Sequence, residues 1–121
     1  MEFSLFILII SLLLLHEMDA IRTKEWKMFI VLKDMADETA YKIFTLAHLP
    51  LYFTAFYVMI NGNPIAILIF YYVIDIFLIG HSVVHYAFKS NPNNGFTSVF
   101  SKTIIYVLGF LAIAHLCILS S

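Results

Sequence analysis

Four long apolar runs dominate the chain, and short polar segments separate them. A helix needs about 20 mostly apolar residues to cross a bilayer. The pattern therefore predicts membrane-spanning helices over about residues 3–26, 38–60, 64–89 and 97–119. The predicted fold class is an all-α integral membrane four-helix bundle, formed by one domain over residues 1–121.

The first run and the segment after it set the shape of the first connection. The run is purely apolar only to Leu15, so it must continue through polar residues toward Trp26, a residue type that favours the membrane interface. The apolar residues 28–32 follow, and we expect them to form a short interfacial segment in the headgroup region between the first two helices.

Local signals mark where the other helices begin. Asp34 or Asp37 is predicted to cap the second helix. "NGNP" is a tight turn, and its Pro64 suits the first position of the third helix. "SNPNNG" forms the next loop, after which Thr97 or Ser98 is predicted to cap the fourth helix.

Composition excludes several classes of protein. The chain is 62% hydrophobic and 12% charged, whereas soluble domains carry about a quarter charged residues. A net charge of -1 without a basic run argues against nucleic-acid binding. The single cysteine excludes an internal disulfide and a thiolate metal cluster. Because Glu2 replaces the basic start of a signal peptide, and no small-residue cleavage site follows, we expect the first run to be retained.

The basic residues predict the orientation. All of them lie around the connection between the first two helices or the connection between the last two: Arg22, Lys24, Lys27, Lys33, Lys42, Lys89 and Lys102. By the positive-inside rule these two connections face the cytoplasm. We therefore expect both termini to lie outside the cytoplasm.

Histidines are the most informative polar residues in the apolar runs. Ionisable groups are costly in hydrocarbon, so they face the protein interior and often mark a functional site. His16, His48 and His81 lie six, six and eight residues from the nearest basic residue of their helix, or roughly 9, 9 and 12 Å in depth. His85 is one turn from His81 on the same helix face.

Matched depth on three helices predicts a shared metal site. The candidate ligands are the four histidines at this level, His16, His48, His81 and His85. Glu17 and Asp19 fall in the same slab and are candidate catalytic groups that move protons, or additional ligands. Zinc, ahead of iron, accepts imidazole and carboxylate ligands. The alternative is that these side chains hydrogen-bond to one another and only hold the helices together.

Three further polar residues lie elsewhere in the predicted core. Asp75 and His115 are each roughly 20 Å from the cytoplasmic boundary, so the two match in depth and can pair. Ser82 shares a helix face with Asp75 and can connect it toward the main site. His115 is expected to be structural.

Three strings carry a resemblance to known families: "LLLLHEMDAIRTKEW" (residues 12–26), "FTLAHLPLY" (44–52) and "DIFLIGHSVVH" (75–85). They resemble an uncharacterised bacterial family of small four-helix membrane proteins with the pattern His-Glu-x-Asp-Ala, Glu-Trp, His-x-Pro-Leu and HxxxH. This resemblance implies a bacterial inner-membrane location and no assigned activity. The chain is more loosely similar to membrane proteins named for a His-x-x-Glu-Glu motif, although Ala20 replaces one glutamate.

A second resemblance concerns chemistry. Membrane-embedded zinc hydrolases of the alkaline ceramidase type combine three histidines, an aspartate and a serine, with HxxxH on one helix. His81, Ser82, His85 and Asp75 resemble that set, on four spans in place of seven.

The sequence leaves three functions open. The first is a zinc- or iron-dependent membrane enzyme, a hydrolase or an oxidoreductase, that acts on a lipid-like substrate. The second is a haem or quinone electron-transfer protein, or an ion- or proton-conducting module. The third is a structural or regulatory subunit with hydrogen-bonded histidines. The expected partners are membrane lipids and, because four short helices enclose little volume, a second copy of the chain.

Overall fold

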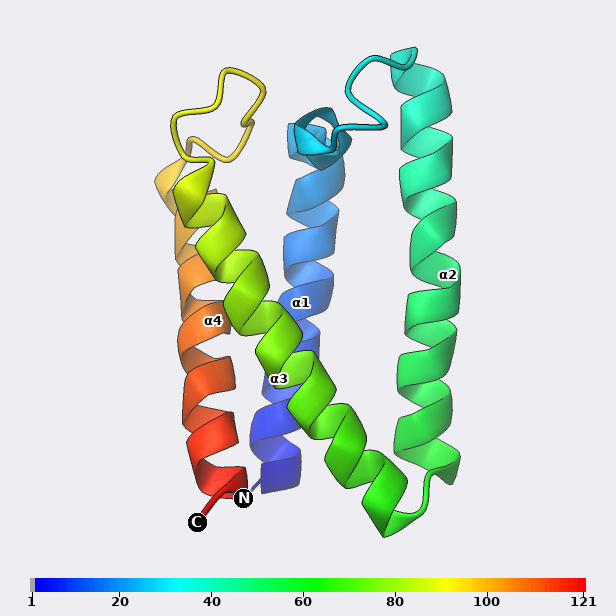
Figure 1. Cartoon of the computed structure of the whole chain (residues 1–121), viewed down its shortest axis with the longest axis vertical. Helices are drawn as coiled ribbons and strands as arrows, with labels where there is room; N and C mark the ends of the chain where they lie inside the picture. Colours follow the sequence, from blue (N-terminus) through cyan, green and yellow to red (C-terminus); the bar gives the residue numbers. More distant parts are fainter. Residues whose placement is uncertain (1) are drawn as a thin grey trace.

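Four long α-helices make up most of the protein in this computed structural model, which describes residues 2–121 (Figure 1). They are α1 (Glu2–Thr23), α2 (Asp37–Asn61), α3 (Pro64–Ala87) and α4 (Val99–Leu119), and the short 3-10 helix η1 (Glu25–Met28) follows α1. No strand occurs in the described residues. Each of the four α-helices is long and apolar enough to cross a membrane. The predicted all-α, four-helix architecture is confirmed.

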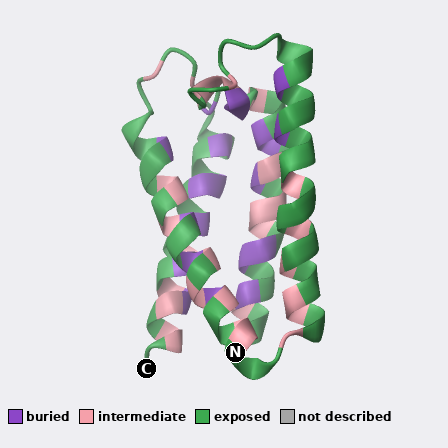
Figure 2. Cartoon of the chain, turned by 45° about the vertical axis from the view of Figure 1, so that its right-hand side comes forward, coloured by how far each residue is buried: buried purple, intermediate pink, exposed green. Residues whose placement is uncertain are grey.

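Three of the helices form the packed core. α4 packs against both α1 and α3, and buried residues line the facing sides of these helices (Figure 2). One apolar cluster joins Ile9, Leu78 and Leu108 from α1, α3 and α4. α3 and α4 approach so closely that a Cβ on Gly109 would collide with the Ser82 side chain. Small residues permit this kind of close helix contact in membrane proteins.

α2 is the peripheral helix. It stands at one side of the other three helices (Figure 1). Its buried residues are Ala40 and Phe44, both near its beginning. There they join an apolar cluster with Trp26 of η1 and Phe96 of the α3–α4 loop. The buried part of α2 is therefore its beginning, and further along the helix His48 contacts Glu17 of α1.

The helix ends show which capping signals operate. Asn63 caps α3, with Pro64 as the first helical residue, and Ser98 caps α4 by accepting a hydrogen bond from the Ser101 amide. The prediction of an aspartate cap for α2 was wrong, because its N-cap is Ala36 and makes no side-chain cap. The Asp37 carboxylate instead accepts a hydrogen bond from Lys24 Nζ at 2.6 Å.

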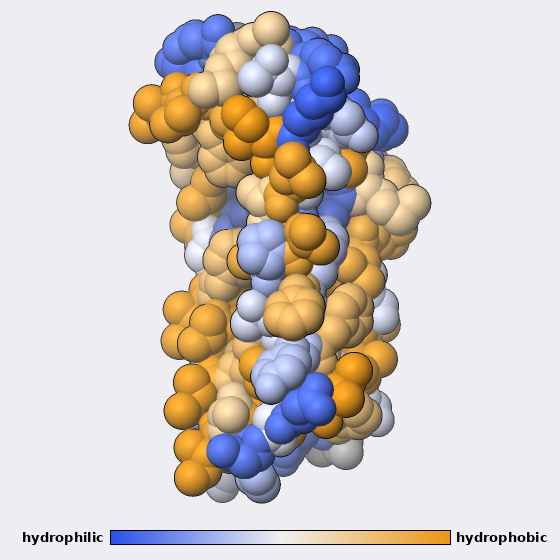
Figure 3. Space-filling view, turned by 90° about the vertical axis from the view of Figure 1, so that its right-hand side faces the viewer, coloured by the Kyte–Doolittle hydropathy of each residue, from blue (hydrophilic) through white to orange (hydrophobic). Residues whose placement is uncertain are grey.

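Polar segments gather at the two ends of the molecule. Both termini and the α2–α3 turn lie at one end, and the α1–α2 and α3–α4 connections lie at the other (Figure 1). On the face drawn in Figure 3, the most hydrophilic side chains gather at the two ends, and mainly hydrophobic side chains with some of intermediate hydropathy lie between them. All seven basic residues belong to the end with the two connections.

Candidate metal centre

A left-handed residue at the end of α1 turns the chain back toward the core. Lys24 has φ 54° and ψ 54°, a conformation that non-glycine residues seldom adopt. α1 ends at Thr23 as a result, before the predicted residue 26. The turn begins η1, whose first two residues, Glu25 and Trp26, are both buried. Glu25 is thus returned to the bundle interior although it lies beyond the helix.

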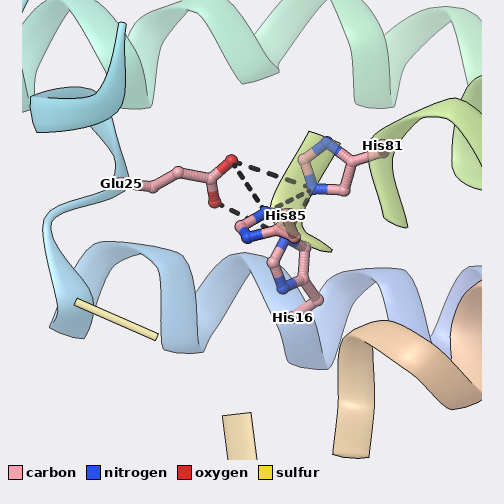
Figure 4. Close-up of side chains that lie close together, drawn as sticks. All are labelled: His16, Glu25, His81 and His85. Carbon is pink, nitrogen blue, oxygen red and sulfur yellow. Dashed lines mark hydrogen bonds and ion pairs between the residues drawn. The ribbon is translucent and has the colours of Figure 1, made fainter. Parts of the chain in front are cut away.

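Four side chains converge beside this turn (Figure 4). The metal-ligating atoms of all four lie within 4.8 Å of one another, and we call this group the histidine–glutamate cluster: His16, Glu25, His81 and His85. His16 comes from α1, Glu25 from η1, and the other two from successive turns of α3. Three segments distant in sequence therefore contribute to one group.

The spacing within the cluster is that of ligands around one small ion. His16 Nε2 and His85 Nε2 lie 2.8 and 3.2 Å from His81 Nε2. The Glu25 carboxylate oxygens lie 3.5, 3.8 and 3.6 Å from Nε2 of these histidines, in sequence order. Two ligand atoms each 2.0–2.1 Å from a tetrahedral zinc ion are roughly 3.3 Å apart. The observed separations lie on both sides of this value.

Hydrogen bonding alone leaves the cluster poorly satisfied. A neutral imidazole nitrogen carries either one proton or one lone pair, yet His81 Nε2 meets the nitrogens of both His16 and His85. No described residue hydrogen-bonds Glu25 Oε2, which is buried. A cation between the four groups would satisfy the carboxylate and all three lone pairs.

The environment of Glu25 favours its charged form. Burial raises the pKa of the Glu25 carboxyl. The interactions with His85, His16 and His81 lower this pKa by more than burial raises it. The net result is a pKa below the ordinary value. The charged form is the one in which a carboxylate binds a metal ion.

The cluster is shielded on one side and accessible on another. His16 and His85 are buried, and the Phe96 ring lies 5.4 and 4.5 Å from their ring centroids. His81 is only partly buried, with a side chain 17% exposed. Access to the cluster is therefore from the His81 side.

Two of the predicted site residues lie in a separate pair. His48 Nε2 lies 2.9 Å from Glu17 Oε2, between α2 and α1, and His48 Nδ1 donates a hydrogen bond to the Phe44 carbonyl at 2.6 Å. The Phe44 bond places a proton on Nδ1, so a hydrogen bond between His48 Nε2 and Glu17 requires a second proton on one of the two groups. The structure does not bring His48 into the cluster, because its Nε2 contacts Glu17 of α1.

Asp19 is also held away from the cluster. Its Oδ1 accepts hydrogen bonds from Arg22, one turn later on α1, at 2.9 Å. Arg22 also donates to Ser101 Oγ of α4 at 3.3 Å. Asp19 and Arg22 thus link the end of α1 to the beginning of α4.

Asp75 and His115 form a buried pair of their own. His115 Nδ1 lies 2.7 Å from Asp75 Oδ2, and neither side chain is exposed. The pair joins α3 to α4 near the end of α4, and Phe6 and Tyr71 pack around His115. Ser82 donates to the Ile105 carbonyl and so ties the same two helices together.

Glu25 is the cluster residue that sequence reasoning did not place. A first helix that continued to residue 26 would carry Glu25 to the membrane boundary, away from the candidate ligands. The Glu-Trp pair just after the first apolar run was the available signal. A buried Trp26 in a connector requires that the connector fold back onto the core, and its neighbour Glu25 moves with it.

The chain belongs to the family of unknown function DUF6713, whose family model matches residues 2–121. This confirms the expected resemblance to an uncharacterised family. No curated protein and no solved structure matches the chain.

Proposed function

We propose that this protein is a small polytopic membrane protein that holds one divalent metal ion in the histidine–glutamate cluster, as a metal-dependent enzyme acting on a lipid-like substrate. The observation that carries the proposal is the Glu25 carboxylate. It is 4% exposed, and its oxygens lie 3.5–3.8 Å from three imidazole nitrogens.

The donor set indicates which ions fit. Zinc binds imidazole and carboxylate ligands, and a catalytic zinc site keeps a position for water beside three protein ligands or expands to five-coordinate; non-haem iron takes the same ligand types. Haem fits poorly, because its two axial ligands bind opposite faces of the macrocycle. Nitrogens 2.8 Å apart, as in His16 and His81, leave no room for a macrocycle between them. We therefore favour zinc, with iron second.

The surrounding residues suggest how such a site would work. A bound divalent ion lowers the pKa of its water and polarises a carbonyl oxygen. The partly exposed His81 lies where substrate and water reach the cluster. Glu17 contacts His48 at 2.9 Å between α1 and α2, and it follows the ligand His16 in the chain. This pair is suited to accept a proton released at the site.

The location of the site follows from the expected orientation. The cluster lies toward the end of the molecule that carries both connections and all the basic residues. By the positive-inside rule this is the cytoplasmic end. We propose a site near the cytoplasmic face of a bacterial inner membrane, with both termini on the opposite side.

A cobalt titration of tag-free protein in mild detergent tests the metal site. Co²⁺ replaces zinc and gives visible absorption that depends on its coordination. We expect saturation at one ion per chain. His85→Ala should weaken binding by more than roughly tenfold, since even outer-shell partners are worth 10–100-fold. His48→Ala is the matched control and should bind as the unmodified protein does; equal behaviour of the two variants would contradict the proposal.

A further inference from the structure

A cavity of about 480 Å³ lies directly against the cluster. Apolar residues line it from the α1–α2 connection (residues 28–31) and from the end of α3 and just after it (Val84 and Phe88). The cluster residues Glu25, His81 and His85 complete the lining. Sites for small organic ligands have volumes of about 300–1,000 Å³, so this cavity is large enough to take one.

The two parts of the cavity differ in chemistry. Its walls are apolar side chains, and the polar groups that line it are three of the candidate metal ligands. The wall residues are also poorly covered by the protein itself, since Ile30 and Val84 are 84% and 50% exposed. A ligand that fits both parts has an apolar chain at one end and a metal-binding head at the other.

The position of the cavity favours a ligand that comes from the bilayer. It lies between the connection after α1, expected at the headgroup level, and the cytoplasmic end of α3. An amphiphile in the adjacent leaflet has its head at the same level and its chain in the hydrocarbon. It can therefore reach the cluster without leaving its normal depth.

We propose that this cavity binds an acyl chain of a membrane amphiphile, with the oxygen atoms of its head at the metal position beside His81 and His85. This inference rests on the metal site proposed above and names the substrate class of that site. Carbonyl and hydroxyl oxygens are ligands that zinc accepts, and the apolar walls select for a long chain. The cavity thus supplies specificity, and the cluster supplies the chemistry.

Alkyl hydroxamates are suitable probes, because the hydroxamate head binds divalent ions and the chain length can be varied. Tag-free, Co²⁺-loaded protein in detergent would be titrated with dodecanohydroxamate and with acetohydroxamate. The readout is the change in Co²⁺ absorption. We expect dodecanohydroxamate to change the spectrum at a concentration at least roughly tenfold lower than acetohydroxamate does. Burial of about two methylene groups is enough for this difference.

Two neighbouring valines provide a matched pair of variants. Val84 lines the cavity, whereas the exposed Val83 on the same helix does not. Val84→Trp should fill the cavity and remove the chain-length preference while Co²⁺ uptake stays normal. Val83→Trp should keep the preference and so controls for partition of the probe into micelles. Ile30→Asp, on an exposed wall residue outside the helices, should act like Val84→Trp without disturbing helix packing.

The outcomes separate the two proposals. A Co²⁺ spectrum that responds equally to both hydroxamates, or that keeps its preference in Val84→Trp and Ile30→Asp, would overturn the acyl-chain inference and leave the metal site intact. Absence of Co²⁺ binding in the unmodified protein would overturn the metal site, and this inference with it.

Discussion

The environment of one carboxylate distinguishes the cluster from an ordinary set of packed histidines. A buried carboxylate is costly unless hydrogen bonds or a cation compensate it. At Asp19 and Asp75 a direct partner is present within 3 Å, Arg22 in one case and His115 in the other. At Glu25 the nearest nitrogens stand 3.5–3.8 Å away, and there are three of them. The arrangement suits an ion in the middle better than any pairwise contact.

Replacing Glu25 by glutamine tests this difference. Glu25→Gln keeps the size of the side chain but removes the charge, so we expect zinc or Co²⁺ affinity to fall by more than roughly tenfold. Glu17→Gln is the matched control, because Glu17 contacts His48 and is outside the cluster. Metal titration of both variants checks the prediction. Loss of metal from Glu17→Gln with none from Glu25→Gln would reverse the assignment of ligand and proton acceptor.

The Asp75–His115 pair is expected to be structural. Asp75→Leu or His115→Leu alone leaves the other polar group buried without its partner, and we expect each to destabilise the protein by roughly 3 kcal/mol. The double variant removes both polar groups and should recover most of that loss. Thermal unfolding in detergent measures stability, and Co²⁺ uptake should be unchanged in all variants that fold. A double variant no more stable than the single variants would show that Asp75 and His115 have a role besides bonding to each other.

Part of the site was predictable at the level of single residues. His81 and His85 share a helix face through their spacing, and His16 matches them in depth. Both features follow from regular helix geometry. The position of Glu25 depends on a left-handed Lys24, which no sequence rule predicts for a lysine. His48 matched in depth as well, but depth along a helix does not tell which neighbour the helix faces.

At the level of elements, the close contact between α3 and α4 positions two of the three imidazoles. Gly109 of α4 lies against Ser82, which is next to His81. A shift of α3 relative to α4 would therefore move the cluster. The helices themselves could be predicted from the apolar runs, since length and hydropathy suffice to recognise a span. Their neighbours could not, because the apolar residues that face lipid and those that face helices have the same composition.

Gly109→Ala tests the contact. The added methyl group would meet the Ser82 side chain, and overpacking of this kind costs roughly 1–3 kcal/mol. Gly80→Ala is the control on the facing helix, because nothing lies within 4 Å of its added Cβ. That variant should be neutral or slightly stabilising, since alanine has the higher helix propensity. Thermal unfolding in detergent compares the two; equal stability would argue against close α3–α4 packing.

At the level of the whole molecule, the basic residues all lie toward one end of the long axis. The two connections that carry the basic residues lie at one end, and the termini and the α2–α3 turn lie at the other (Figure 1). The sequence predicted this separation, because an even number of spans returns the chain to its starting side. Which end faces the cytoplasm is predicted only by the positive-inside rule.

Cysteine labelling in intact cells tests the orientation. Cys117, an exposed free cysteine, is first changed to alanine, and single cysteines are then introduced at Asn61 and Asn93. We expect a membrane-impermeant thiol reagent to label Asn61→Cys in intact cells and Asn93→Cys only after the membrane is opened. The reverse pattern would place the cluster near the outer face and leave its geometry unaffected.

The metal content of the protein tests the central claim most directly. Tag-free protein, purified in mild detergent and dialysed against buffer containing a trace of zinc, would be analysed for zinc, iron and other transition metals. We predict one ion per chain in the unmodified protein and in His115→Ala, and severe loss in Glu25→Gln and His85→Ala. An unmodified protein that retains no metal, or variants of the cluster that retain as much as His115→Ala, would contradict the account.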